Sequence, residues 1–246
     1  MKKRYYEGVK IAIMQPTFLP WLGYLNLMAT VDTFVFLDDV QISPKSFMTR
    51  NRIPKRGNSF HWLAIREIKN LKIEDRFLNN TQITDIPETI KLISEGIENS
   101  YEESKYRELF IDKLHSELSA SHSIADINIG LIEFLLDALD INVNTIRSSR
   151  LNAKGSKSEK VLNILNNFDW TSYVAVPGAV AYMREDPLWQ GLESKLEIYH
   201  YEPIPYKQSN SKEFIPFMSS VDALLELGAE EARKVMLSGS QPPLPW

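Results

Sequence analysis

The sequence contains no cysteine, and this absence excludes several kinds of chemistry at once. Without thiols, the 246-residue chain cannot form disulfides, use a thiolate nucleophile, or hold zinc or an iron–sulfur cluster through cysteine ligands. Any reaction that the protein carries out must therefore use oxygen and nitrogen groups.

Histidine is scarce as well. The chain has four of them, His61, His115, His122 and His200. No two stand four residues apart, as the common helical zinc motif requires, so we expect no metal site. The sequence also has no G-x-S-x-G motif and no Ser/His/Asp arrangement that spacing can assign, which leaves a hydrolase triad without support.

Long apolar runs and an excess of positive charge are missing too. No window approaches the roughly 20 apolar residues that a membrane-spanning helix needs. The basic N-terminus precedes an apolar run of only Ile11 to Met14, which is too short for a secretory signal and predicts a cytoplasmic protein. The net charge of −4 predicts no general affinity for nucleic acid, although a local basic cluster could still bind a phosphate.

Three apolar segments near the N-terminus form a recognisable unit. Residues 9–15 are expected to form a buried strand, 21–30 a helix, and Thr33–Leu37 a second strand. This is the span of a βαβ unit, which implies parallel strands and a right-handed crossover. We therefore predict an α/β fold with a Rossmann-like, nucleotidyltransferase-like parallel sheet.

The middle of the chain has helical spacing, and alternation of strands and helices resumes after it. The spacing predicts helices over 88–99, 104–118 and 124–140, preceded by a loop over Gln41–Asn58 and a strand at Phe60–Ile65. Later strands are expected at Val143–Arg147, Thr171–Val176 and Lys195–His200. A helix is expected over Ser156–Phe168, with Ser156 and Glu159 as a capping box, and another from Ser219 or Ser220 to Gly228.

These elements predict one α/β domain over residues 1–236, with a helical insertion around 85–140. Residues 237–246 are rich in proline and have no periodicity. We expect them to form an extended or disordered tail, docked through Trp246.

The first candidate site is the stretch QPTFLPWLGY, Gln15 to Tyr24, where the first strand passes into the first helix. Ligands of parallel sheets collect at such strand ends, and a helix N-terminus attracts phosphate. We predict that Gln15, Pro16, Trp21 and Gly23 contact a phosphate-bearing substrate, with Gly23 leaving room for close approach, and that Tyr24 is catalytic. The alternative is a tightly packed turn.

The position of this stretch resembles that of the H-x-G-H turn of nucleotidyltransferases, in which two histidines hold a triphosphate. Trp21 and Tyr24 stand where those histidines would be, so both are absent here. This departure argues against adenylyl or cytidylyl transfer by that mechanism.

Asp38 and Asp39 follow the second strand and are the candidate catalytic carboxylates. They could accept a proton, bind a metal, or hold a ribose or an amine. The alternative is an ordinary turn or a helix cap. Gln41, just beyond them, is a further candidate for binding substrate.

Arg50, Asn51 and Arg52 begin the densest basic cluster of an acidic protein. Guanidinium groups suit phosphates and carboxylates, so the triplet is a candidate phosphate clamp. The alternative is a solvated basic loop.

Two further strand ends carry small or basic residues. Ser148 and Ser149 follow one predicted strand, Lys154 and Lys157 flank a helix start, and Gly178 follows another strand. Small hydroxyls, lysines and a glycine at these places suit an anion. The segment is neither a Walker A motif nor a dinucleotide fingerprint, and helix capping also explains part of it.

Taken together, these stretches resemble the WbqC-like family over nearly the whole chain, from Ile11 to about Gly228. The resemblance is carried by I-x-x-M-Q-P-T-F-L-P-W-L-G-Y, V-D-T-F-V-F-L-D-D-V-Q, R-N-R-I, S-S-x-L-x-x-K-G-S-K-S-E-K-V-L, P-G-A-x-x-Y, Glu202–Tyr206 and S-x-x-D-A-L-L-E-L-G. The run Lys157 to Lys160 departs mildly from a Lys-Thr-Glu-Arg pattern in the family.

The resemblance implies a bacterial cytoplasmic protein associated with surface polysaccharide (O-antigen) gene clusters. The reaction that fits best is acyl or aminoacyl transfer to a nucleotide-linked or otherwise phosphate-activated sugar. The alternatives are a nucleotidyl or adenylyl transferase in which Lys154 or Lys157 replaces the missing histidines, and a non-catalytic binding protein of the assembly machinery. The cofactor and the oligomeric state are left open.

Overall fold

A six-stranded, mostly parallel sheet forms the centre of the computed structural model, which describes residues 7–43, 45–66, 72–121 and 123–246. The strands are β1 (Glu7–Met14), β2 (Thr33–Phe36), β5 (Asn144–Arg147), β6 (Asp169–Ala175), β7 (Leu196–Ile198) and the antiparallel β8 (Leu244–Pro245). Their order is β5-β2-β1-β6-β7-β8. The chain thus extends the sheet first to one side of β1 and then to the other, so the α/β, Rossmann-like prediction is confirmed.

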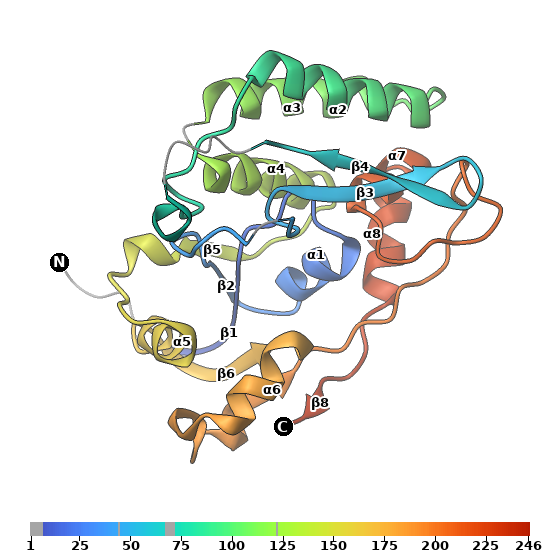
Figure 1. Ribbon diagram of the computed structural model, residues 1–246. Coiled ribbons are helices and arrows are strands. Elements are labelled where there is room, and N and C mark those ends of the chain that lie inside the picture. Colours follow the sequence, from blue (N-terminus) through green and yellow to red (C-terminus); the bar gives the residue numbers. More distant parts are fainter. Residues whose placement is uncertain (1–6, 44, 67–71, 122) are drawn as a thin grey trace.

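Helices cover both faces of this sheet (Figure 1). They are α1 (Leu22–Ala29), α2 (Ile86–Ser100), α3 (Arg107–Ala120), α4 (Ile124–Ala138), α5 (Lys157–Leu165), α6 (Pro177–Glu185), α7 (Ser220–Leu227) and α8 (Ala229–Ser238). Because side chains alternate along β1, Ala12 packs with α1 and α4, whereas Ile11 and Ile13 pack with α5 and α6. Two apolar cores result, one on each face.

The predicted loop over Gln41–Asn58 is wrong in its second half. Arg50–Lys55 forms β3, which pairs antiparallel with β4 (Ser59–Ala64) in a separate hairpin. The turn uses Gly57 and Asn58, both with positive φ. Pro54 made this strand hard to recognise in the sequence. Proline has no backbone N–H to donate to a neighbouring strand, so within sheets it is confined to edges.

The middle of the chain matches the predicted helices closely. Its three helices, α2, α3 and α4, begin and end within three residues of the expected ranges. Figure 1 shows α2 and α3 as an outer layer above the hairpin. Ile53 and Leu63 fill the space between the hairpin and the helices, and both are almost fully buried.

Several local predictions need correction. The capping box is wrong, because the Ser156 side chain makes no capping hydrogen bond at the start of α5. Pro177 and Gly178 open helix α6, in which Pro177 is the first residue, a position that suits its fixed φ. Helix α8 extends to Ser238, and the segment after it adds strand β8 beside β7. Trp246 packs against the core on the α5–α6 face.

Candidate functional site

Buried polar side chains hold the turn that follows β1. Asn51 of β3 is 2% exposed and donates through Nδ2 to the carbonyls of Phe18 and Leu19, at 3.2 and 2.7 Å. Asn128 of α4 donates to the Pro16 carbonyl at 2.8 Å. Leu19 has a φ of 45°, a left-handed conformation that costs a non-glycine residue roughly 1–3 kcal/mol. The surrounding hydrogen bonds therefore fix the turn in a shape that it would not adopt alone.

Gly23 lies under the side chain of Trp21, the N-cap residue of α1. A Cβ at Gly23 would lie 2.2 Å from the Trp21 ring, so the missing side chain makes room for the indole. The space beside Gly23 is thus occupied by the protein itself, and contact of Gly23 with a ligand stays a prediction. The Tyr199 hydroxyl, just after β7, donates to the Gly23 carbonyl at 2.7 Å and anchors the helix start.

Tyr24 also stabilises the turn through a hydrogen bond. Its hydroxyl donates to the Gln15 carbonyl at 3.0 Å, and its side chain is 2% exposed. Burial raises the pKa of the Tyr24 phenol well above its ordinary value, so the group stays protonated near neutral pH. These contacts suit a structural group better than a proton acceptor.

A cleft of about 280 Å³ opens where this turn, α1 and the hairpin meet. It is lined by Met14, Thr17, Trp21, Tyr24, Phe47, Asn51, Arg52 and Phe217. The Trp21 and Phe217 rings are 5.3 Å apart, and the Phe47 and Phe217 side chains are about half exposed at the rim. An apolar, aromatic cleft with few polar groups is typical of a small-molecule site, and this one lies at the carboxyl end of β1.

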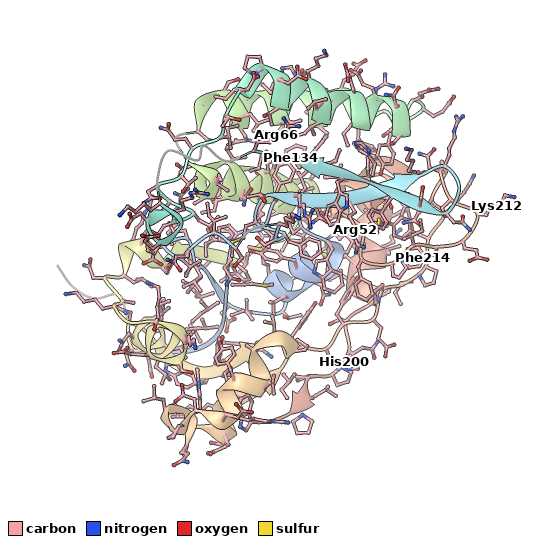
Figure 2. The ribbon with its side chains drawn as sticks, viewed as in Figure 1. Arg52, Arg66, Phe134, His200, Lys212 and Phe214 are labelled. Atoms are coloured by element: carbon pink, nitrogen blue, oxygen red, sulfur yellow. The ribbon has the colours of Figure 1, made fainter. Side chains whose placement is uncertain are left out.

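Arg52 supplies the positive charge of the cleft. Figure 2 shows it on the side of the hairpin that faces α1. Its Nη2 donates to the Phe217 carbonyl at 3.3 Å, whereas its buried Nε has no hydrogen-bond partner. No carboxylate of the described residues pairs with it. Its remaining guanidinium donors suit a phosphate or a carboxylate.

Asp38 joins the end of β2 to the end of β5. Its carboxylate accepts hydrogen bonds from Ser149 N at 2.9 Å, Ser149 Oγ at 2.7 Å and Ser148 Oγ at 3.1 Å. The residue is 1% exposed. Three donors on a buried carboxylate indicate a group that holds the two strand ends together.

Asp39, its neighbour, is more accessible, with 24% of its side chain exposed. It shares the single hydroxyl proton of Ser148 with Asp38, with 2.5 Å between the Asp39 carboxylate and that Oγ, and it pairs with Lys160 of α5 at 2.7 Å. Lys160 also donates to the Ala153 carbonyl at 3.1 Å. Sequence reasoning missed Lys160, although a lysine on the apolar side of an amphipathic helix, next to Val161, is a signal that could have found it.

The structure divides the predicted site residues into two groups. Trp21, Tyr24, Asn51 and Arg52 line the cleft, while Asp38, Asp39, Ser148 and Ser149 form the carboxylate network. Within the described parts of the chain, no hydrogen bond, ion pair or ring contact joins the network to the cleft lining. Sequence reasoning did not single out Met14, Thr17 or Phe217 as cleft residues.

The other predicted residues lie outside both groups. Gln41 donates to the Glu74 carbonyl at 2.8 Å. Lys154 and Lys157 are exposed in the segment before and at the start of α5. Gly178 is exposed, and a Cβ there would meet nothing within 4 Å, so its position does not require glycine.

The described residues offer neither a metal-binding cluster nor a membrane-spanning helix. His122 lies outside the described residues; among the rest, no three acidic or histidine side chains gather where they could hold a metal ion. Of the helices in the described ranges, none combines the length and the apolar character that a bilayer crossing requires.

Comparison with known proteins gives a family and one similar protein. The chain is 26% identical over 232 residues to "Uncharacterized protein Rv1507c" of Mycobacterium tuberculosis, a match that covers 90% of this chain and 95% of that protein. No solved structure matches. The sequence model of the WbqC-like protein family matches residues 15–234, from the turn after β1 into α8. The chain therefore belongs to the WbqC-like protein family.

Proposed function

We propose that this protein is a group transferase, which moves an acyl or aminoacyl group onto a nucleotide-linked or otherwise phosphate-activated sugar. The product would be used in the cytoplasmic synthesis of bacterial surface polysaccharide or a related sugar. The observation that carries the proposal is the aromatic cleft at the carboxyl end of β1, with Arg52 in its wall and no carboxylate of the described residues against that guanidinium. Uncompensated positive charge beside aromatic rings favours an anionic organic ligand.

In the transfer, a sugar amine or hydroxyl attacks the carbonyl carbon of the activated acyl group. A C–N or C–O bond forms, the bond to the carrier breaks, and the carrier leaves with the bonding electrons. The proton of the nucleophile passes to a carboxylate, for which Asp39 is the better candidate because Asp38 already accepts three hydrogen bonds. Lys160 would hold Asp39 in place through their ion pair.

The nucleotidyl-transfer alternative has less support. Lys154 and Lys157, which would have to replace the missing histidines, do not line the cleft. A non-catalytic binding protein would use the same cleft without any transfer of a group.

The test is a binding screen followed by a transfer assay. Thermal shift and calorimetry with nucleotide sugars, sugar phosphates, nucleoside triphosphates and acyl carriers identify the ligand, and mass spectrometry then follows the mass of the sugar substrate. We expect a nucleotide sugar or a sugar phosphate to bind, and to gain an acyl or aminoacyl mass in the presence of an acyl donor. Release of pyrophosphate, or tight binding without transfer from any donor, would contradict the proposal.

Arg52→Gln provides the site control. Loss of a hydrogen-bonded ion pair with a phosphate should weaken binding by about 1.5–3 kcal/mol, roughly 10- to 100-fold. Arg184→Gln is the matched variant, because Arg184 also stacks on an aromatic ring, that of Trp246 at 5.6 Å, but does not line the cleft. Equal effects of the two variants would show that the cleft is not the binding site.

A further inference from the structure

The exposed face of the β3–β4 hairpin carries a row of alternating guanidinium groups and aromatic rings. Arg50 and Arg52 stand two residues apart on β3, so their side chains point to the same face. The Arg50 guanidinium carbon lies 4.0 Å from the centre of the Trp62 ring. The Arg52 carbon lies 4.9 Å from the centre of Phe60 and 5.8 Å from that of Trp62. We call these four residues the hairpin ladder.

The hairpin ladder continues into the cleft. Arg52 belongs to both, and Phe47, at the cleft rim, has its ring centre 6.3 Å from that of Trp62. The opposite face of β3 is fully used by the fold, since Asn51 and Ile53 are buried. The ladder face is partly open to solvent, and the Phe60 side chain is 41% exposed.

The unusual part of this surface is a pair of neighbouring cations that have no counter-ion among the described residues. Arg50 uses Nε to donate to the Lys45 carbonyl at 3.0 Å, and its two terminal nitrogens have no partner in the described part of the chain. Arg52 uses Nη2, and its Nη1 has no partner among the described residues either. Like charges on neighbouring positions of one strand face repel each other, and an anion bound between them would relieve that repulsion.

We infer that the substrate is a sugar linked to a nucleoside diphosphate, with the two adjacent phosphoryl groups on Arg50 and Arg52 and the base against the aromatic wall of the cleft. This inference rests on the proposed function and selects one substrate class within it. Flat guanidinium groups bind phosphate oxygens through paired N–H donors, and stacking on Trp62 and Phe60 holds the two groups in place. Stacking of the base on Trp21 and Phe217 accounts for the ring-lined cleft.

The inference separates nucleotides from other phosphate-activated sugars. An isoprenyl diphosphate or a sugar phosphate would bring an anion to the hairpin ladder but no planar ring to the cleft. A nucleoside would bring the ring without the charge. A nucleoside diphosphate uses both parts, so it should bind more tightly than either fragment.

Calorimetry with unreactive ligands provides the test. The probes are a nucleoside, its monophosphate, its diphosphate, inorganic pyrophosphate, an isoprenyl diphosphate in detergent and a short single-stranded oligonucleotide. With each of the common bases tried, we expect one diphosphate to bind about 10- to 100-fold more tightly than its monophosphate, because a second charged contact is added. Stronger binding of pyrophosphate, isoprenyl diphosphate or the oligonucleotide would overturn the inference.

Variants assign the two parts of the site. Arg50→Gln should reduce the preference for diphosphate over monophosphate to about threefold or less, and Arg50→Lys should restore only part of it, because lysine keeps the charge but not the planar donors. Phe217→Ala should weaken the nucleoside and leave pyrophosphate unchanged. Arg184→Gln should alter none of these affinities, and circular dichroism confirms that each variant is folded.

This experiment does not depend on turnover. If the diphosphate preference is found but no group is transferred, the proposed reaction fails and the substrate class stands. If a sugar phosphate is acylated but nucleoside diphosphates do not bind, the reaction stands and the inference fails. A diphosphate preference that Arg50→Gln leaves unchanged also overturns the assignment to the hairpin ladder.

Discussion

Asp38 and Asp39 show how differently two adjacent carboxylates can be used. Replacing Asp38 with asparagine turns one acceptor oxygen into an NH2 group that faces donors from Ser148 and Ser149. Leaving these buried donors unsatisfied should lower the free energy of unfolding by about 1–3 kcal/mol. Asp39→Asn should cost less stability, because Asp39 is partly exposed, and should abolish most of the turnover.

Urea denaturation and a transfer assay on the same preparations separate these effects. A variant Asp38→Asn as stable as wild type would contradict the anchoring role. Full turnover in Asp39→Asn would remove that residue from the mechanism.

At the same scale, the residue types of the site were predictable and their partners were not. The strand ends pointed to Asp38, Asp39, Ser148 and Ser149, and these four do lie together. The partner of Asp39, Lys160, lies 121 residues away in sequence. The spacing of residues along the chain does not indicate such a distant contact. Likewise, the fragment around Gly23 looked open to a ligand because the sequence does not show that the Trp21 ring folds back over it.

At the scale of elements, a buried carboxylate ties α7 to the rest of the helical layer. Asp222 accepts from the hydroxyl of Tyr101 at 2.7 Å, that of Tyr206 at 2.5 Å, and Gln208 Nε2 at 2.8 Å. Burial, and secondarily the nearby Glu226, raises the pKa of Asp222 from 3.8 to about 6, against the lowering effect of those hydrogen bonds. This junction should therefore make the stability of the protein depend on pH.

The sign follows from the proton balance. Between about pH 4 and pH 6 the unfolded chain has released the Asp222 proton while the folded protein still binds it, so raising the pH favours unfolding. A shift of this size corresponds to about 3 kcal/mol. Compared with Asp222→Asn, which cannot titrate there, wild type should lose about that much stability from pH 4 to pH 7. A difference that stays constant or grows with pH would contradict the raised pKa.

Elements with strong periodicity were predicted well, and those defined by tertiary pairing were not. The three helices of the insertion have apolar residues at helical spacing, which identifies them without knowledge of their neighbours. In strand β3, the buried residues Asn51 and Ile53 alternate with the more exposed Arg50 and Arg52. The sequence does not show an apolar alternation there, because the buried Asn51 is polar and makes hydrogen bonds to the turn after β1. Strand β8 exists because it pairs with β7.

At the scale of the whole molecule, the sheet brings distant segments to one edge. The cleft collects the end of β1, the start of α1, the hairpin and the segment before α7, which includes Phe217. The parallel arrangement of the strands was predictable from the βαβ pattern. The contribution of Phe217 was not, because a residue with positive φ in an aperiodic segment leaves no pattern in the sequence.

The carboxylate network lies at the ends of β2 and β5 and reaches α5, on the opposite face of the sheet from α1. A transferase that uses both places would hold its substrate across the carboxyl edge of the sheet. We propose that the substrate enters the cleft beside Arg52.

A crystal structure with a bound nucleoside diphosphate sugar tests that claim most directly. We expect ligand density against Trp21 and Phe217, with phosphate oxygens within hydrogen-bond distance of Arg52. Density confined to the separate groove lined by Lys55, Arg56 and His61, with an empty cleft, would contradict it.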